Sequence, residues 1–102
     1  MKKLKEIYNK VLESAMHESE LTLEQLANSR AENCVITRVV IVETLIKLGL
    51  TENDIVRLSG MSQQRINSLK NSAKYRLSGL AARILMDEVW KQVNELTCNI
   101  QK

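Results

Sequence analysis

The chain has 102 residues, a formal net charge of +3, no proline, no phenylalanine and only three glycines. A chain of this length has room for one hydrophobic core, and the scarcity of helix breakers and aromatic residues disfavours a strand-rich fold. We therefore expect an all-α fold of about six helices that forms a single compact domain over residues 1–102. No segment approaches the roughly 20 consecutive apolar residues of a membrane span, and no apolar signal segment follows the N-terminal lysines, so we expect a cytoplasmic protein without a membrane partner.

The N-terminal third shows the periodicity of helices. Apolar residues at three- and four-residue spacing predict a helix over about residues 3–18. Thr22 and Gln25 have the spacing of a capping box, in which each side chain bonds the backbone N–H of the other residue, and this predicts the start of a short helix. Ser29 and Glu32 repeat the spacing, so we expect a second capping box at the start of the next helix.

A long apolar segment occupies residues 35–48. Its β-branched residues favour a strand, but its length without a turn signal exceeds the about five or six residues of a typical strand. We therefore expect a buried central helix, with a strand as the alternative. Gly49 stands where a helix C-terminus favours a left-handed residue, and Thr51 is placed to cap a helix over residues 52–58. Gly60 is expected to end that helix.

Two further helices are expected in the remaining part of the chain. Ser62 is placed to cap a helix that continues to about Ala73, and a stripe of apolar residues predicts a last helix over about residues 80–96. Residues 97–102 are expected to fray. No repeat, low-complexity stretch or linker interrupts this order, so we expect no internal domain boundary.

The charges are distributed unevenly along the chain. Residues 6–32 contain six glutamates and two bases, whereas residues 55–86, here called the acid-free window, contain no acid and six bases. The bases of the window are Arg57, Arg65, Lys70, Lys74, Arg76 and Arg83. Such an asymmetry indicates an anionic partner for the C-terminal half. The alternative is an ordinary solvated surface from which acids are absent by chance.

Residues 51–76 have the pattern of a helix-turn-helix. This motif needs a short supporting helix, a tight turn that usually contains glycine, and a second helix whose first residues are exposed and enter the major groove of DNA. Ile55 is placed to anchor the first helix, Gly60 permits the turn, and Ile66 with Leu69 holds the second helix to the core. The motif predicts double-stranded DNA as the anionic partner.

Polar side chains stand at the start of the second helix of this motif. The amides of glutamine and asparagine match adenine in a two-point contact, and the guanidinium of arginine matches guanine. The residues expected to contact base edges are Gln63, Gln64, Arg65 and Asn67. A solvated first turn without a partner is the alternative, because polar residues are common at helix starts.

A second set of residues is expected to contact the DNA backbone or the minor groove, which positions a protein on DNA without specifying sequence. This set comprises Arg30, Arg38, Ser62, Lys70, Lys74, Arg76 and Arg83. Two interpretations of Arg38 stay open, because it lies in the otherwise apolar start of the central helix. It either reaches the DNA or is an exposed residue at that helix end.

Residues that support enzyme or metal chemistry are sparse. Cys34 and Cys98 lie far apart without neighbouring ligand types, so they predict neither a metal site nor a disulfide framework. His17 is the only histidine, and no nucleophile, metal cluster or phosphate loop accompanies it. We expect no enzymatic activity and no cofactor.

The sequence from residue 37 to residue 74 resembles the Trp repressor family and aligns with it without a gap. A Thr-Arg-Val-x-Ile-Val-Glu run of that family is matched by Thr37, Arg38, Val39, Ile41, Val42 and Glu43. The turn glycine, an isoleucine of the recognition helix and an Asn-Ser-x-Lys stretch are matched by Gly60, Ile66, Asn71, Ser72 and Lys74. The resemblance implies a bacterial DNA-binding protein of the Trp repressor-like fold.

The chain is also similar to the C-terminal DNA-binding domain of the bacterial replication initiator, which belongs to the same superfamily. The matching positions are Leu26, Ser29, Arg30, Val35 and Arg38. The resemblance implies a minor-groove contact for Arg38. The initiator begins its recognition helix with an Asp-His-Thr-Thr run, and residues 62–65 occupy those places without matching that chemistry, so the target sequence is expected to differ.

Two departures narrow the expected function. In the repressor family, tryptophan is held between two arginines next to a glycine. Arg38 and Ser72 of this chain match residues of that pocket. Ser68 replaces the second arginine, and Leu69 replaces the glycine. A leucine is expected to fill that space, so we expect no tryptophan corepressor. The chain also lacks a glycine-rich phosphate loop, so it is not itself expected to be an initiator.

Taken together, these features predict a sequence-specific double-stranded DNA-binding protein, a repressor-like transcription regulator without tryptophan as corepressor. The alternative is a helical module that binds a protein partner through the N-terminal helix and the surface around Trp90, and does not bind DNA. The oligomeric state stays open, because the repressors form homodimers whereas the initiator domain binds as a single unit. The target sequence, the direction of regulation and the existence of an effector are equally open.

Overall fold

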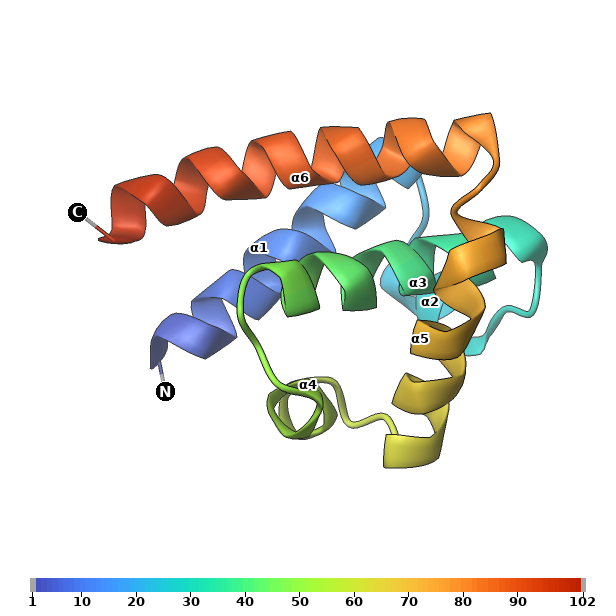
Figure 1. Ribbon diagram of the computed structural model, residues 1–102, viewed down its shortest axis with the longest axis horizontal. Coiled ribbons are helices and arrows are strands. Elements are labelled where there is room, and N and C mark those ends of the chain that lie inside the picture. The colour runs from blue at the N-terminus through green and yellow to red at the C-terminus, as the bar shows by residue number, and fades with distance from the viewer. Residues whose placement is uncertain (1, 102) are drawn as a thin grey trace.

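Six α-helices make up the computed structural model, which describes the backbone of residues 2–101 and the side chains of residues 3–94 (Figure 1). The helices are α1 (Lys2–Ser19), α2 (Leu23–Asn28), α3 (Glu32–Lys47), α4 (Glu52–Ser59), α5 (Gln63–Arg76) and α6 (Leu80–Gln101). The described backbone contains no strand. The expected all-α fold is therefore confirmed, including a helix for the long apolar segment 35–48.

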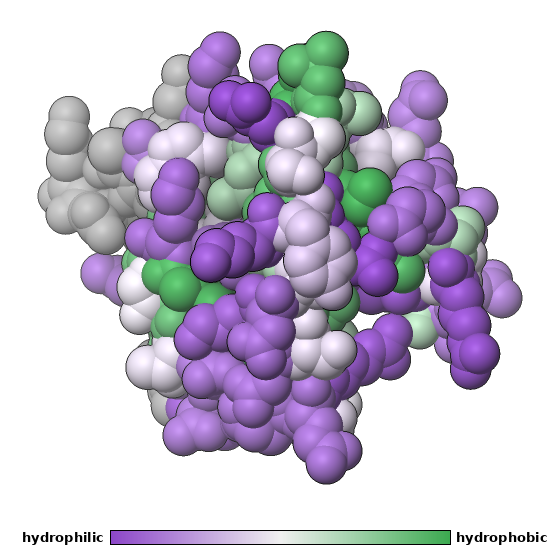
Figure 2. All heavy atoms as spheres, turned by 45° about the vertical axis from the view of Figure 1, so that its right-hand side comes forward, coloured by the Kyte–Doolittle hydropathy of each residue, from purple (hydrophilic) through white to green (hydrophobic). Residues whose placement is uncertain are grey.

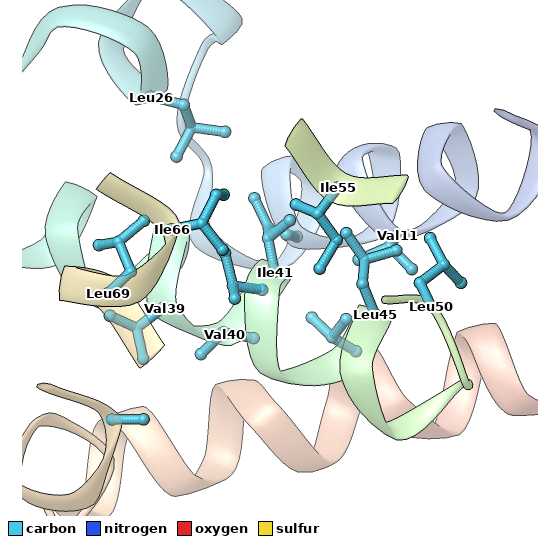
Figure 3. Close-up of a cluster of buried hydrophobic side chains, with 14 of the residues drawn as sticks. Val11, Leu26, Val39, Val40, Ile41, Leu45, Leu50, Ile55, Ile66 and Leu69 are labelled. Atoms are coloured by element: carbon cyan, nitrogen blue, oxygen red, sulfur yellow. The ribbon is translucent and has the colours of Figure 1, made fainter. Parts of the chain in front are cut away.

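Helix α3 is buried at the centre of the molecule, which explains why its sequence is apolar on nearly every face. It packs against α1, α2, α4, α5 and α6. The side chains of Val39, Val40, Val42 and Leu45 are fully buried, and Figure 3 shows the surrounding helices contributing apolar side chains around them. Even the buried hydroxyl of Thr37 has a partner, because it donates to the carbonyl of Asn33 at 2.7 Å. Burial at the centre of the molecule stabilises α3 by more than the modest helix propensity of its β-branched residues costs.

Helices α1 and α6 lie together along one side of α3, as Figure 1 shows. Val11 and Ala15 of α1 are buried, and so are Val89 and Val93 of α6. The centre of the apolar face of α1 is therefore used inside this chain, whereas Leu4, Ile7, Tyr8 and Leu12 on the same helix are only partly buried.

A polar bridge joins the same two helices. The hydroxyl of Ser14 donates to Oε1 of Gln92 at 2.5 Å, and the amide of Gln92 donates in turn to the carboxylate of Glu18. Ser14 is buried, so the bond satisfies a hydroxyl that has left water.

The two expected capping boxes have different outcomes. The hydroxyl of Thr22 accepts from the N–H of Gln25, and the side chain of Gln25 accepts from the N–H of Thr22, which confirms the first box. The second box is wrong, because α3 follows Ala31 and has no side-chain cap. Ser29 instead ends α2, and its hydroxyl accepts from the N–H of Ala31 at 3.2 Å. It lies two positions too early to reach the third N–H of α3.

Glycine and capping residues mark the later boundaries as expected. Gly49 and Gly60 have φ of +104° and +78°, in the left-handed region that costs glycine little. Thr51 caps α4 and Ser62 caps α5. The expectation of a frayed end after residue 96 is wrong for the backbone, because α6 continues to Gln101. Neither glycine nor proline follows to stop it.

None of the described helices combines the length and the apolar character that a membrane span requires.

We expect Leu45→Ala to lower the free energy of unfolding by about 2–5 kcal/mol, because it opens a cavity in a fully buried position of α3. The matched control is Leu80→Ala, since Leu80 is 74 % exposed and its loss should change stability by no more than about 0.5 kcal/mol. Urea denaturation followed by circular dichroism measures both values. Equal losses for the two variants would contradict the central position of α3.

Candidate nucleic-acid interface

Residues 51–76 form one structural unit, here called the α4–α5 unit. Thr51 and Asp54 form a capping box at the start of α4, and the left-handed Gly60 ends that helix. After this turn the hydroxyl of Ser62 accepts from the N–H of Arg65 at 3.2 Å and so caps α5. Both helices of the unit are anchored by fully buried side chains, Ile55 of α4 and Ile66 of α5.

The four residues that were expected to contact bases lie together on the exposed N-terminal half of α5. They are Gln63, Gln64, Arg65 and Asn67, and each is exposed. Ile66 and Leu69 of the same helix turn inward, since residues at three- and four-residue spacing share one face. In Figure 1 this end of α5 projects away from the other helices, beyond α4.

Figure 2 presents this side of the molecule as a space-filling view. Hydrophilic side chains gather over the lower part of the face, at the height where the N-terminal end of α5 lies in Figure 1. Near the junction of α5 and α6, the large side chains of Tyr75, Leu80 and Ile84 are exposed. The polar end of α5 is thus the part of this face that suits a strongly hydrated ligand.

Glu52 places a carboxylate beside the start of α5, which the charge pattern along the chain did not indicate. Its Oε1 accepts from the amide of Gln63 at 3.4 Å, and its Oε2 lies 3.8 Å from Nζ of Lys70. Both contacts are at the surface and weak. Glu52 of α4 is outside the acid-free window in the sequence, but in the folded chain it lies beside residues of the window and partly neutralises the charge of Lys70.

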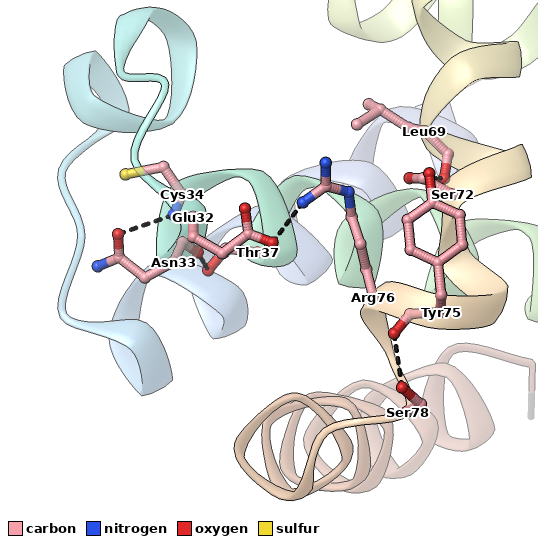
Figure 4. Close-up of polar contacts among 9 residues, drawn as sticks. All are labelled: Glu32, Asn33, Cys34, Thr37, Leu69, Ser72, Tyr75, Arg76 and Ser78. Atoms are coloured by element: carbon pink, nitrogen blue, oxygen red, sulfur yellow. Dashed lines mark hydrogen bonds and ion pairs between the residues drawn. The ribbon is translucent and has the colours of Figure 1, made fainter.

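Arg76 is the second base of the window that acquires an acid from outside it. Its guanidinium donates to the carboxylate of Glu32 at the start of α3, and its side chain is only 26 % exposed. Figure 4 shows the pair bridging the end of α5 and the start of α3. Arg76 was expected to contact the DNA backbone, but in this structure it joins two helices. The neighbouring Tyr75 is exposed, and the charge of Arg76 lies 5.9 Å from its ring centre.

Three of the six bases in the window thus have acid partners, because Arg57 also bonds Asp54 at 3.0 Å. Arg65, Lys74 and Arg83 are exposed and form no ion pair within the described part of the chain.

Arg38 lies inside the molecule, which neither of its two interpretations anticipated. It is 8 % exposed, so the expectation of an exposed residue is wrong. Its guanidinium donates to the carbonyls of Leu26 and Ser29, and more distantly to that of Gln25 at 3.5 Å. The carbonyls of Leu26 and Ser29 lie at the C-terminal end of α2, where carbonyls commonly lack a partner within the helix, whereas that of Gln25 also accepts from the N–H of Ser29. The side chain therefore caps α2 rather than standing free to reach DNA.

The surroundings of Arg38 also change its ionisation. Burial lowers the pKa of its guanidinium, and the nearby positive charge of Arg65 lowers that pKa further. The hydrogen bonds to α2 carbonyls compensate the charge only in part. Arg38 and Arg65 thus act on each other as like charges although they lie on different helices.

The remaining residues of the expected DNA-contacting set are distributed over three elements. Arg30 is exposed in the loop between α2 and α3, and Arg83 is exposed on the first turn of α6. Lys74 is exposed on α5, and Ser62 is exposed at its N-cap. Three of these four positions, Arg30, Lys74 and Arg83, are exposed cations.

Leu69 and Ser72, which the sequence comparison set against pocket positions of the repressors, both face inward. Leu69 is 8 % exposed and belongs to the core. Ser72 is buried, and its hydroxyl donates to the carbonyl of Leu69 at 2.9 Å. Ser68 is exposed and carries no charge.

Among the described side chains, no group of three or more histidine, cysteine or acidic residues is placed to hold a metal ion. Cys34 is buried in the first turn of α3, whereas the side chain of Cys98 lies outside the described residues. His17 is exposed near the end of α1.

Comparison with protein-family models, with curated proteins and with solved structures gives no match to this chain. The resemblance to the Trp repressor family therefore depends on the residues named above. The function of the α4–α5 unit has to be argued from its own side chains.

The capping box of α4 predicts a pH dependence of stability. Hydrogen bonds from the backbone N–H and the hydroxyl of Thr51, together with Arg57, hold the pKa of Asp54 below its ordinary value of 3.8. A depressed carboxyl pKa stabilises the fold above the unfolded-state pKa, and this contribution is lost as the pH falls through the folded-state pKa. We expect Asp54→Asn to destabilise the protein at pH 7, with a difference from wild type that shrinks steadily below about pH 4.

Urea denaturation between about pH 2 and pH 7 measures this difference. The matched control is Asp87→Asn, because Asp87 is exposed on α6 and caps no helix. A deficit of Asp54→Asn that grows on acidification would have the wrong sign for this cap.

Proposed function

We propose that this protein binds double-stranded DNA sequence-specifically, as a repressor-like transcription regulator, and that the α4–α5 unit is a helix-turn-helix. The observation that carries the proposal is the exposed N-terminal half of α5. It displays Gln63, Gln64, Arg65 and Asn67 at the projecting end of the molecule, while Ile66 and Leu69 fix the same helix in the core. A helix held in this way can enter a major groove without unfolding any other element.

The chemistry of the displayed side chains supports base contacts. Each of the amides of Gln64 and Asn67 can donate and accept at once, which fits the N6 and N7 edge of adenine, and Arg65 fits the O6 and N7 edge of guanine. Gln63 is restrained by its contact with Glu52. We therefore assign the main discrimination between base pairs to Gln64, Arg65 and Asn67.

Cations around α5 support contacts to phosphates. Lys74 and Arg83 are exposed without acid partners within the described residues, and Arg30 is exposed beside the start of α3. Lys70 is available once its weak contact with Glu52 is exchanged for a phosphate. Arg38 and Arg76 are left out of this set, because both guanidiniums join helices of the chain itself.

The alternative, a helical module that binds a protein partner, receives no specific support from the surfaces it would use. The centre of the apolar face of α1, at Val11 and Ala15, is buried, and this helix packs against α3 and α6. Trp90 is half-buried, and Nζ of Lys47 covers its ring at 4.8 Å from the centre. We therefore keep DNA binding as the single proposal.

Selection of binding sites from random duplexes is the experiment that tests the proposal. We expect an enriched consensus and an affinity for it that falls steeply with salt. Contacts from Arg30, Lys70, Lys74 and Arg83 to about four phosphates would give a slope of roughly −3 to −4 in log affinity against log salt. The absence of any enriched sequence, or an affinity that ignores salt, would refute it.

Substitutions on α5 should separate base contacts from phosphate contacts. Gln64→Ala and Asn67→Ala are expected to relax the sequence preference, at a cost of about 1–3 kcal/mol on the consensus site. Lys74→Ala should weaken binding to all duplexes alike and reduce the salt slope by about one. Fluorescence anisotropy on consensus and scrambled duplexes measures both effects.

The control for this series is Lys91→Ala, because Lys91 is exposed on α6, away from the projecting end of α5. It should change neither preference nor slope. Identical behaviour of Asn67→Ala and Lys74→Ala would overturn the assignment of roles within α5.

Tryptophan is expected not to act as a ligand. Leu69 stands where the repressors have a glycine and its side chain belongs to the core, and Ser68 stands where they have the second arginine. Isothermal titration calorimetry should detect no binding at micromolar tryptophan, and duplex affinity should not change when tryptophan is added. Micromolar binding of tryptophan would contradict this expectation.

A further inference from the structure

Glu52 places a negative charge on the side of α5 that carries part of the base-contacting set. Gln63, Asn67 and Lys70 are separated by four and three residues, so they lie in one row along this helix. Glu52 of α4 reaches both ends of the row, because its Oε1 lies 3.4 Å from the amide nitrogen of Gln63 and its Oε2 lies 3.8 Å from Nζ of Lys70. A base pair that meets this row therefore lies close to a carboxylate.

The start of α4 holds this carboxylate in place. Glu52 is the first residue of α4, where the positive end of the helix dipole favours a negative charge. Its side chain is 32 % exposed, so it lies partly against the surface of the protein. The other acid of this turn, Asp54, is engaged in the capping box with Thr51 and in the ion pair with Arg57. Glu52 is thus the acid of this turn that is directed at α5.

The carboxylate decides the orientation of the Gln63 amide. A carboxylate only accepts hydrogen bonds, so a neighbouring amide turns its NH₂ group toward it and its carbonyl away. A glutamine matches adenine in a two-point contact only when its amide donates to N7 and accepts from N6 at the same time. Because the NH₂ group of Gln63 is directed at Glu52, that contact is not available. The two side chains together present acceptors, namely the carbonyl of Gln63 and the remaining lone pairs of Glu52.

Cytosine is the base that fits a surface of acceptors. Its major-groove edge presents the N4 amino group as a donor and no acceptor, whereas the edges of adenine, guanine and thymine each present an acceptor that the carboxylate repels. We propose that Glu52 is a specificity-determining residue, which makes the protein prefer cytosine at the base pair that Gln63 contacts. This inference rests on the proposed function. It assigns to Gln63 a different base from the adenine that a free glutamine amide favours.

Selection from random duplexes with Glu52→Ala tests this assignment. Loss of the carboxylate frees the Gln63 amide for the two-point contact, so we expect the consensus to change from cytosine to adenine at one base pair and to stay the same elsewhere. Two duplexes that differ only at this pair are then compared by fluorescence anisotropy. The wild type should bind the cytosine duplex about tenfold more tightly than the adenine duplex, and the variant should reverse this order. A role of Glu52 in stability alone would weaken both duplexes alike.

Two further variants locate the effect. Gln63→Ala identifies the base pair, because it should weaken the preference at the same pair and at no other. The matched control is Glu13→Ala, which removes the same charge from an exposed position on α1. Glu13 also has a comparable weak contact, since its Oε2 lies 3.9 Å from Nζ of Lys10. This control should leave the consensus unchanged, and circular dichroism checks that each variant is folded.

A measurement without DNA tests the contact itself. In NMR spectra of the full chain, Glu52→Ala should shift the side-chain amide signals of Gln63 and leave those of Gln25 in α2 unchanged. Unshifted Gln63 signals would overturn the proposal, and so would a consensus that Glu52→Ala leaves the same at every pair. If the Gln63 signals shift but the wild type selects no consensus, the proposed function is refuted and the base assignment falls with it.

Discussion

The arrangement of this protein depends on the burial of α3. Because α3 is apolar on nearly every face, it can be stable only where other helices surround it, and α1, α5 and α6 provide most of that cover. Packing against α3 fixes which face of α5 turns inward. Ile66 and Leu69 go to the core, and Gln64 and Asn67 are left at the surface by helical geometry alone. The candidate DNA-contacting face is therefore a consequence of core packing, and it sits on a rigid element.

The local charge around α5 depends on ion pairs between helices that are distant in the sequence. Along the chain, residues 55–86 contain six bases and no acid, but Glu32 and Glu52 approach two of these bases from α3 and α4. The result is a gradation: Arg76 is held against α3, Lys70 is weakly restrained, and Lys74 stands free of acids within the described residues. A surface graded in this way confines its strongest attraction for phosphates to a few side chains, which favours a defined orientation on a duplex.

The short helix α2 illustrates how one buried charge serves several purposes. A helix of six residues is unstable by itself, and here Leu26 anchors it to the core while Arg38 bonds its last carbonyls. The same arginine forms part of the wall of a cavity beside the turn of the α4–α5 unit. Its burial is tolerable because the carbonyl dipoles of α2 compensate the charge in part.

The sequence by itself determined the six helices, most of their boundaries and the identity of the exposed residues on α5. Apolar periodicity, glycines with left-handed backbone and the threonine and serine caps are local signals, and they act within a few residues of the place they mark. The same local pattern failed at Ser29, because that residue was already engaged in ending α2. Only the tertiary structure decided that Arg38 is buried, that Arg76 pairs with Glu32 and that Arg65 faces a cavity, because each depends on groups brought together from distant parts of the chain.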